Sequence, residues 1–208
     1  MRKLERSDIM DYLMYQEMKE EFRLKIYKMK KARRIFLGDK LLFIFDNTEM
    51  VKNRILETIE HEKLFLEQDL VRQLDFFNPL IAGPGELRCS MIVLNDDLGW
   101  EKSKRIKFWH DLAAHIYFVL DNGTTIYAEK PQISELNQHP CSMRLLKFFC
   151  GNHFPIKIGS DYFLDSEYQR EERLTNLQQQ VLREDLNILQ VPVATTIHYD
   201  DINIYGVE

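Results

Sequence analysis

The sequence predicts an α+β fold, with N-terminal helices packed on a mostly antiparallel β-sheet and a charged helix near the C-terminus. Apolar residues recur at helical spacing up to Leu80, whereas short apolar runs separated by turn signals dominate after Gly83. Asp121-Asn122-Gly123 is the clearest turn signal, because Asn-Gly pairs favour tight β-hairpins. We expect one domain over residues 1–187 and a tail or edge strand over residues 188–208.

A long N-terminal helix is expected from Asp8 to about Arg34. One apolar face repeats at spacings of four and three residues and should be buried: Met14, Met18, Phe22, Ile26 and Met29. The segment from Lys25 onward is rich in Lys and Arg. We interpret it as a solvated surface that complements the helix dipole, with a phosphate or RNA site as the alternative.

A hairpin and a second helix should follow. Ile35–Leu37 and Leu41–Phe45 flank a Gly-Asp-Lys turn and are typical of two short strands. Asp46, Asn47 or Thr48 should then cap a helix. The apolar face of this helix contains Val51, Ile55, Ile59 and Leu66.

Glu62 falls on that same predicted apolar face. A buried carboxylate needs a partner, so we expect a basic residue beside it. The candidates are Arg33, Arg34 and Arg54.

The rest of the chain should form strands joined by turns, with two further helices. The expected elements are a helical face from Leu70 to Phe77, strands Leu87–Leu94, Ile116–Leu120, Thr124–Glu129, Met143–Cys150 and Pro155–Ile158, a polar loop Pro131–Pro140, and helices Gly99–Ala113 and Ser166–Asn187.

Composition excludes several classes of protein. The formal net charge of -5 disfavours a nucleic-acid binder, because phosphate affinity comes mainly from Lys and Arg. No apolar run approaches the length that spans a bilayer, and the N-terminus carries charges where a signal peptide needs an apolar core. The three cysteines cannot all pair within the chain. We expect a cytoplasmic protein without a membrane segment.

Helix-borne Glu and His residues are the main metal-ligand candidates. Glu57, His61 and Glu62 share one predicted helix, and Glu with His on helices holds the metals of di-iron bundle proteins. The match is incomplete, because Glu57 and His61 are four residues apart and only one such pair occurs. A surface pair is the favoured interpretation. A metal-dependent enzyme or metal carrier that also uses Glu17 or His115 is the alternative.

A second set, His139, Cys141, Cys150 and His153, has the composition of a zinc site. If Met143–Phe149 is a strand, the two cysteines are roughly 30 Å apart at ~3.3 Å per residue. Separate residues are therefore the favoured interpretation.

His115 follows the segment Trp109-His110-Asp111. His110 and His115 are five residues apart and do not share a helix face, so an ordinary histidine is favoured over one that lines a pocket. No cysteine has a local histidine partner, and no glycine-rich phosphate loop occurs. The sequence leaves open whether the protein is an enzyme and indicates no cofactor.

Several segments together resemble one bacterial family. KKARRIFLGDKLLFIFDNTEMV is similar to its basic-helix, Leu-Gly and Leu-x-Phe-x-Phe-acidic-Asn block, and ILETIEHEKLFLEQDLVRQLDFFNPLIAGPGEL to its Glu-rich helix and Asn-Pro-Leu-Ile block. CSMRLLKFFC with PIKIGSDYFLDSEY is similar to its paired strands and aspartate-histidine-proline-x-tyrosine turn. This is domain-of-unknown-function family number three-five-zero-one, and the resemblance covers about residues 5–187. The candidate binding residues are Arg34, Asn47, Glu57, Glu62, Asn78 and His115.

The chain departs from the family pattern at several polar positions. Thr48 stands where the family has an arginine, Arg54 where it has a glutamine, and Tyr162-Phe163 where it has His-Pro. A family site at these positions would be altered here.

The resemblance implies no established activity. It implies an association with rubrerythrin-like and iron-sulphur oxidoreductase-like proteins, which are often encoded beside family members. We therefore expect an accessory or binding protein of a redox or oxidative-stress system, using a polar pocket between the Glu57–Glu62 helix and the sheet. Homo-oligomerisation is left open.

Overall fold

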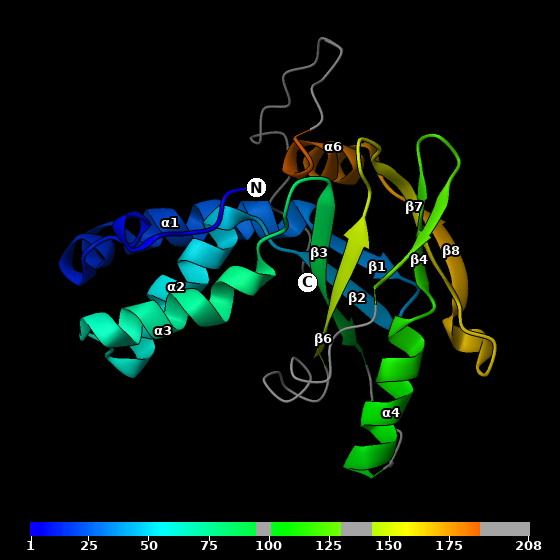
Figure 1. The fold of residues 1–208 in the computed structure, drawn as a ribbon, viewed down its shortest axis with the longest axis horizontal. Coiled ribbons are helices and arrows are strands. Elements are labelled where there is room, and N and C mark those ends of the chain that lie inside the picture. Colours follow the sequence, from blue (N-terminus) through cyan, green and yellow to red (C-terminus); the bar gives the residue numbers. More distant parts are fainter. Residues whose placement is uncertain (95–100, 130–142, 188–208) are drawn as a thin grey trace, which may run out of the picture.

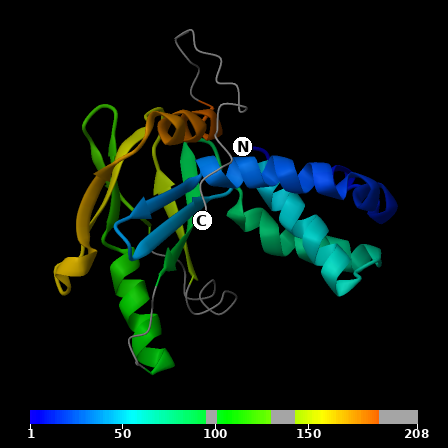
Figure 2. The same cartoon turned by 180° about the vertical axis from the view of Figure 1, so that it is seen from behind.

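A three-helix unit stands beside two antiparallel β-sheets, and each part has a hydrophobic core (Figures 1 and 2). The structure, a computed structural model, describes residues 1–94, 101–129 and 143–187. The predicted α+β class, with N-terminal helices, antiparallel pairing and a C-terminal helix, is confirmed. The loop predicted over Pro131–Pro140 and the tail from residue 188 lie outside the described residues.

Most predicted elements are present. The helices are η1 Arg6–Asp8, α1 Tyr12–Ala32, α2 Thr48–Glu62, α3 Glu67–Phe77, η2 Asn78–Leu80, α4 Lys102–Ala113, η3 Ser166–Tyr168 and α6 Asn176–Asp185, where η marks a 3-10 helix. The strands are β1 Arg34–Leu37, β2 Leu41–Phe45, β3 Glu86–Val93, β4 Ile116–Leu120, β5 Thr125–Tyr127, β6 Met143–Phe149, β7 Pro155–Asp161 and β8 Gln169–Arg173. No helix in the described ranges is both long and apolar enough to cross a bilayer.

The packed face of α1 differs from the predicted one. Tyr15 and Ile26 are buried and Phe22 is partly buried, whereas Met14 is 54% and Met18 38% exposed. The four-residue spacing of the predicted face explains this difference. Steps of four residues advance about 40° per step around a helix, so such a row winds away from any fixed contact.

The prediction that Glu62 is buried is wrong. Asn47 caps α2 as expected, but the helix ends at Glu62 because Lys63 adopts a left-handed conformation with φ 54°. Glu62 is therefore exposed in the last turn, and Leu66, the N-cap residue of α3, is also exposed. The residues of the predicted face that are buried are Val51, Ile55 and Ile59.

Two sheets form where one was expected. Their strand orders are β1-β2-β3-β6 and β5-β4-β7-β8, and all neighbouring pairs are antiparallel. The Gly38 backbone N–H donates to Glu172 on β8 at 2.8 Å, and Glu129 pairs with Lys147 on β6. Because the sheets meet at both edges, they form a barrel-like enclosure.

Strand β6 serves both hydrophobic cores. Leu146 and Phe148 pack in the core between the sheets, where α4 and α6 also contribute side chains. Leu145, on the opposite face of the strand, packs with the three-helix unit. This division follows from the alternation of side chains along a strand.

The predicted helix Ser166–Asn187 is wrong in its first half. Gln169–Arg173 forms β8, which pairs with β7 at the edge of the second sheet. All side chains of β8 are exposed, so the strand lacks the apolar alternation that would have revealed it. The helix begins only after Thr175, whose side chain accepts from the Gln178 backbone in a capping box.

Candidate functional site

A groove of about 610 Å³ runs over the exposed face of α2. The residues that line this α2 groove are Lys19, Arg23, Arg54, Glu57, Thr58, Glu60, His61, Glu62 and Phe77. They come from α1, α2 and α3, so the expectation that the sheet supplies one wall is wrong. The candidate residues Glu57, His61 and Glu62 do lie together in it.

Part of the charge in the α2 groove is already neutralised. Lys19 Nζ lies 2.6 Å from Glu60 Oε1, and Gln16 donates to the same oxygen at 2.8 Å. These bonds, the Lys19 bond first, lower the pKa of Glu60. Glu60 is therefore an ionised member of the groove wall.

Three other groove side chains are available to a ligand. Glu57, His61 and Glu62 form no hydrogen bond or ion pair with any residue of the described chain. Burial, followed by the charge of Glu57, raises the pKa of the Tyr15 hydroxyl to about 12. The groove thus presents two unpaired carboxylates and an imidazole.

The geometry does not gather the predicted metal ligands. Within residues 1–94, 101–129 and 143–187, no three His, Cys, Asp or Glu side chains are placed to hold a metal ion. Glu57 and His61 share one face of α2, but Glu62 is turned roughly 100° from His61. Glu17 lies on α1 and His115 precedes β4, so the full candidate set is dispersed over both parts of the molecule.

Two of the three basic residues expected beside Glu62, Arg33 and Arg54, have other partners. Arg33 forms a buried ion pair with Asp185, and Arg54 donates to Asp46 at 3.0 Å. Burial raises the pKa of Asp46, and the Arg54 charge acts in the opposite direction. These pairs stabilise the junction between the helices and the sheets.

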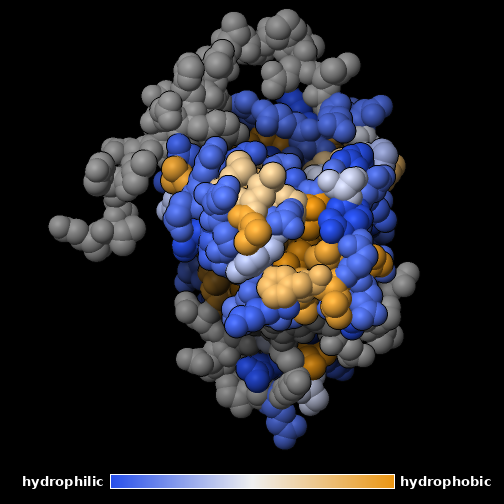
Figure 3. Space-filling model, turned by 90° about the vertical axis from the view of Figure 1, so that its left-hand side faces the viewer, coloured by the Kyte–Doolittle hydropathy of each residue, from blue (hydrophilic) through white to orange (hydrophobic). Residues whose placement is uncertain are grey.

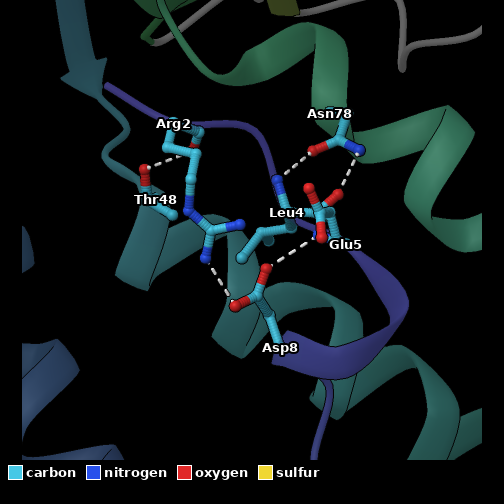
Figure 4. Close-up of polar contacts among 6 residues, drawn as sticks. All are labelled: Arg2, Leu4, Glu5, Asp8, Thr48 and Asn78. Atoms are coloured by element: carbon cyan, nitrogen blue, oxygen red, sulfur yellow. Dashed lines mark hydrogen bonds and ion pairs between the residues drawn. The ribbon is translucent and has the colours of Figure 1, made fainter.

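Asn47 and Asn78 hold the backbone in place. Asn47 Oδ1 accepts from the Met50 N–H at 2.9 Å as the N-cap of α2. Asn78 donates to the Leu4 carbonyl and accepts from the Leu4 N–H, both at 2.9 Å (Figure 4). Arg34 has an exposed side chain on β1. Asn47 and Asn78 therefore have structural roles that account for their side chains.

Thr48 contributes to the same attachment of the N-terminal segment. Its hydroxyl donates to the Arg2 carbonyl at 3.1 Å, and the Arg2 side chain pairs with Asp8 at 2.6 Å (Figure 4). Thr48 thus binds the N-terminal segment of the chain.

His115 belongs to a hydrogen-bonded cluster on the outer face of the second sheet. Its Nδ1 lies 2.7 Å from Asp161 Oδ1, and Tyr127 donates to Asp161 Oδ2 at 2.8 Å. The rings of Tyr162 and Phe163 pack edge-on against the imidazole, with centroids 5.4 and 5.9 Å away. Because Asp161 orients Nδ1, Nε2 is the ring nitrogen left for another group, and it has no partner in the described chain.

Tyr117 occupies the centre of this outer face. Its ring covers Gly159, where a Cβ would lie 2.4 Å from the ring carbon Cζ. Its hydroxyl reaches Glu171 at 3.1 Å, and Lys157 pairs with the same carboxylate at 2.6 Å. Burial, followed by the Glu171 bond, raises the pKa of Tyr117 to about 12. The hydroxyl is therefore a neutral donor.

Asp161 and Tyr127 were not among the predicted site residues. A signal for Asp161 was present, since it is the aspartate of the segment that resembles the family's Asp-His-Pro turn. Tyr127 carried no such signal, because its contact with Asp161 depends on the order of strands in the sheet.

The histidine and cysteine set is only partly described. Cys150 is buried and free, and burial raises the pKa of its thiol to about 12. His153 Nδ1 lies 2.9 Å from Asp121. His139 and Cys141 lie outside the described residues.

An apolar patch lies at the end of the three-helix unit farthest from the sheets. We call Tyr12, Leu13, Phe65 and Leu66 the end patch. The Tyr12 and Phe65 rings are 5.2 Å apart, and Leu13, Phe65 and Leu66 are 70%, 58% and 60% exposed. Figure 3 looks onto this end and shows a hydrophobic area bordered by hydrophilic surface. The α2–α3 turn that carries Phe65 and Leu66 directly follows His61 and Glu62 of the groove.

Comparisons with known proteins give a structure with a similar fold and a family. No curated protein matches the chain. A crystal structure of a novel protein of unknown function from Burkholderia pseudomallei K96243 is similar, with a TM-score of 0.75 and 18% sequence identity, over 89% of this chain and 100% of that one. At that identity the likeness concerns the fold. The family model described as "Protein of unknown function (DUF3501)" matches residues 3–186, so the chain belongs to this family.

Proposed function

We propose that the protein is an accessory protein that binds a protein partner through the end of its three-helix unit. The observation that carries this proposal is the end patch beside the unpaired carboxylates of the α2 groove. Grouped exposed apolar side chains on a protein surface favour a contact with another protein. Protein interfaces commonly combine an apolar centre with a polar rim.

The charges indicate the chemistry of the partner. Glu57 and Glu62 lack cationic partners in the described chain, so a binding surface with Lys or Arg side chains would neutralise them. Phe65 and Leu66 would pack against apolar side chains of the same surface. The partner surface we infer is therefore apolar with a basic border.

A redox protein is the partner class that we propose. This step rests on the association with rubrerythrin-like and iron-sulphur oxidoreductase-like proteins that the family resemblance implies. The end patch and groove supply a surface for such a partner without requiring a cofactor in this chain.

Binding to a purified rubrerythrin-like protein and to a purified iron-sulphur oxidoreductase-like protein tests the proposal. In isothermal titration calorimetry, Phe65→Ser with Leu66→Ser should weaken binding about tenfold or more, as loss of interface anchors does. Glu57→Lys with Glu62→Lys should weaken it and reverse part of its salt dependence. Phe36→Ser is the matched control, because Phe36 on β1 is 51% exposed and lies outside the end patch.

Failure of both redox proteins to bind would contradict the proposed partner class. Equal weakening by Phe36→Ser would contradict the proposed surface. Metal analysis of untagged protein separates the rival function, since stoichiometric metal lost in a Glu57→Ala, Glu62→Ala variant would favour a metal-dependent enzyme or metal carrier.

A further inference from the structure

The outer face of α1 is a second exposed surface. We define it as Met14, Glu17, Met18, Glu21, Leu24, Lys25 and Lys28, which are spaced by one, three or four residues. At about 100° per residue they cover roughly a third of the helix circumference. Tyr15 and Ile26, which are buried, lie on the opposite side, where α1 packs against α2.

Apolar side chains on this face are solvent-exposed. Leu24 is 56% and Met14 54% exposed, although an exposed helix face is normally filled with polar residues. The face is also hollowed by a groove of about 440 Å³. The residues that line the hollow are Glu21, Leu24, Lys25, Lys28 and Met29.

Charges divide this face into two halves. Glu17 and Glu21 lie toward the N-terminal end of α1, and neither forms an ion pair within the described ranges. Lys25 and Lys28 lie toward the C-terminal end. The ion pair of Lys25 with Glu49, at 3.3 Å, joins two exposed side chains, and such pairs contribute little and exchange readily.

We propose that a second copy of this chain covers the outer face of α1, with the two α1 helices antiparallel. In an antiparallel pair the acidic half of each helix meets the basic half of the other. A parallel pair would place Glu17 against Glu17 and Lys25 against Lys25, which is unfavourable. The face is thus complementary to itself under a two-fold axis, as an isologous dimer requires.

The position of the two-fold axis follows from the same residues. With the axis beside the middle of α1, near Glu21 and Phe22, Glu17 of one copy lies opposite Lys25 or Lys28 of the other. Met14 and Met18 of the second copy then lie near the hollow beside Leu24. Flexible methionine side chains suit such an irregular apolar surface.

The size of the face predicts a weak dimer. A helix of 21 residues is about 31 Å long at 1.5 Å per residue, and one helix pair buries an area at the low end for specific interfaces. The dimer fraction should therefore rise with concentration. The end patch shares no residue with this face, so the inference stands apart from the proposed function.

Sedimentation equilibrium of the full chain tests the inference through a charge exchange. Wild type should show a monomer–dimer equilibrium, and Glu17→Lys or Lys25→Glu alone should raise the dissociation constant about tenfold or more. An equimolar mixture of the two variants should recover the wild-type association, because each reversed charge then meets an opposite one. Glu101→Lys, an exposed charge reversal at the start of α4, is the control and should leave association unchanged.

Three results would overturn the inference. These are wild type that stays monomeric at the highest concentration, a dimer that both single reversals leave intact, and a mixture that stays as monomeric as its components. The first would leave the face to a different partner. Circular dichroism of each variant confirms that loss of association is not loss of folding.

Discussion

Arg33 and Asp185 form a buried, two-point ion pair that joins the C-terminal end of α1 to that of α6. Arg33 Nε lies 3.1 Å from Asp185 Oδ2, and Arg33 Nη2 lies 2.9 Å from Oδ1. The two side chains are only 4% and 7% exposed. The pair therefore fixes the three-helix unit to the element that closes the core between the sheets.

Replacing one member of this pair should be strongly destabilising. Asp185→Ala leaves a buried guanidinium without its carboxylate, which should lower the free energy of unfolding by about 3–5 kcal/mol. Adding Arg33→Met should restore much of the loss, because the unpaired charge is then removed. Urea unfolding followed by circular dichroism measures both, and a single variant that loses under about 1 kcal/mol would contradict the buried pair.

Asp46 should make stability depend on pH. Burial raises its folded-state pKa above the unfolded value, so its contribution is fully present below the unfolded pKa and is lost as pH rises through the folded pKa. As the pH falls from about 7 to the unfolded pKa of 3.8, wild type should therefore gain stability relative to Asp46→Asn. Urea unfolding of both proteins checks this, and a constant difference across that range would contradict the raised pKa.

Gly159→Ala should conflict with the tyrosine that covers it. The new Cβ would lie 2.4 Å from Tyr117 Cζ, so the ring must move away and give up its bond to Glu171. We expect a loss of about 1–3 kcal/mol, as for other overpacked sites. Tyr117→Val should make the alanine tolerable, and thermal unfolding of the four proteins in this cycle tests the coupling. Additive effects would show that the two residues are independent.

The thiols of Cys89 and Cys150 should resist modification. Burial raises the pKa of both, that of Cys150 to about 12, and a thiol reagent attacks the thiolate. Of the three cysteines, no more than one should react with Ellman's reagent in the native protein, and all three should react after denaturation. Two fast-reacting thiols in the native protein would contradict this arrangement.

Asn47 and Glu62 should differ sharply in their effect on stability. Asn47→Ala removes the N-cap of α2 and should cost about 1 kcal/mol. Glu62→Gln changes an exposed, unpaired side chain and should stay within about 0.5 kcal/mol of wild type. Parallel urea titrations compare their free energies of unfolding, and a larger loss for Glu62→Gln would contradict the exposed position of Glu62.

Local signals predicted most elements of this fold. The α2 cap, predicted at Asp46, Asn47 or Thr48 and found at Asn47, and the Asp121-Asn122-Gly123 hairpin depend on neighbouring residues, so local sequence indicates them. Strand β8 could not, because its pairing with β7 supplies the structure that its charged residues do not indicate. The prediction that Glu62 is buried was wrong for a related reason, because the turn at Lys63 ends the helix before the apolar repeat ends.

The candidate site was predictable only in part. Glu57, His61 and Glu62 lie in one groove because they share one helix, a relation that spacing reveals. The bonds that join Asp161 to His115 and Tyr127 connect three separate strands and their ends. Such contacts depend on strand order, which local sequence patterns do not specify.

The alternation of β6 side chains between the two cores limits how the protein can accommodate a substitution in either core. A slip of one residue would turn Leu145 toward the core between the sheets and bring Leu146 and Phe148 onto the helix side. The strand therefore cannot shift to fill a cavity on one side without opening a cavity on the other. Amide protons of β6 should lose protection from hydrogen exchange when either core is weakened. Exchange in this strand should therefore measure the stability of both cores.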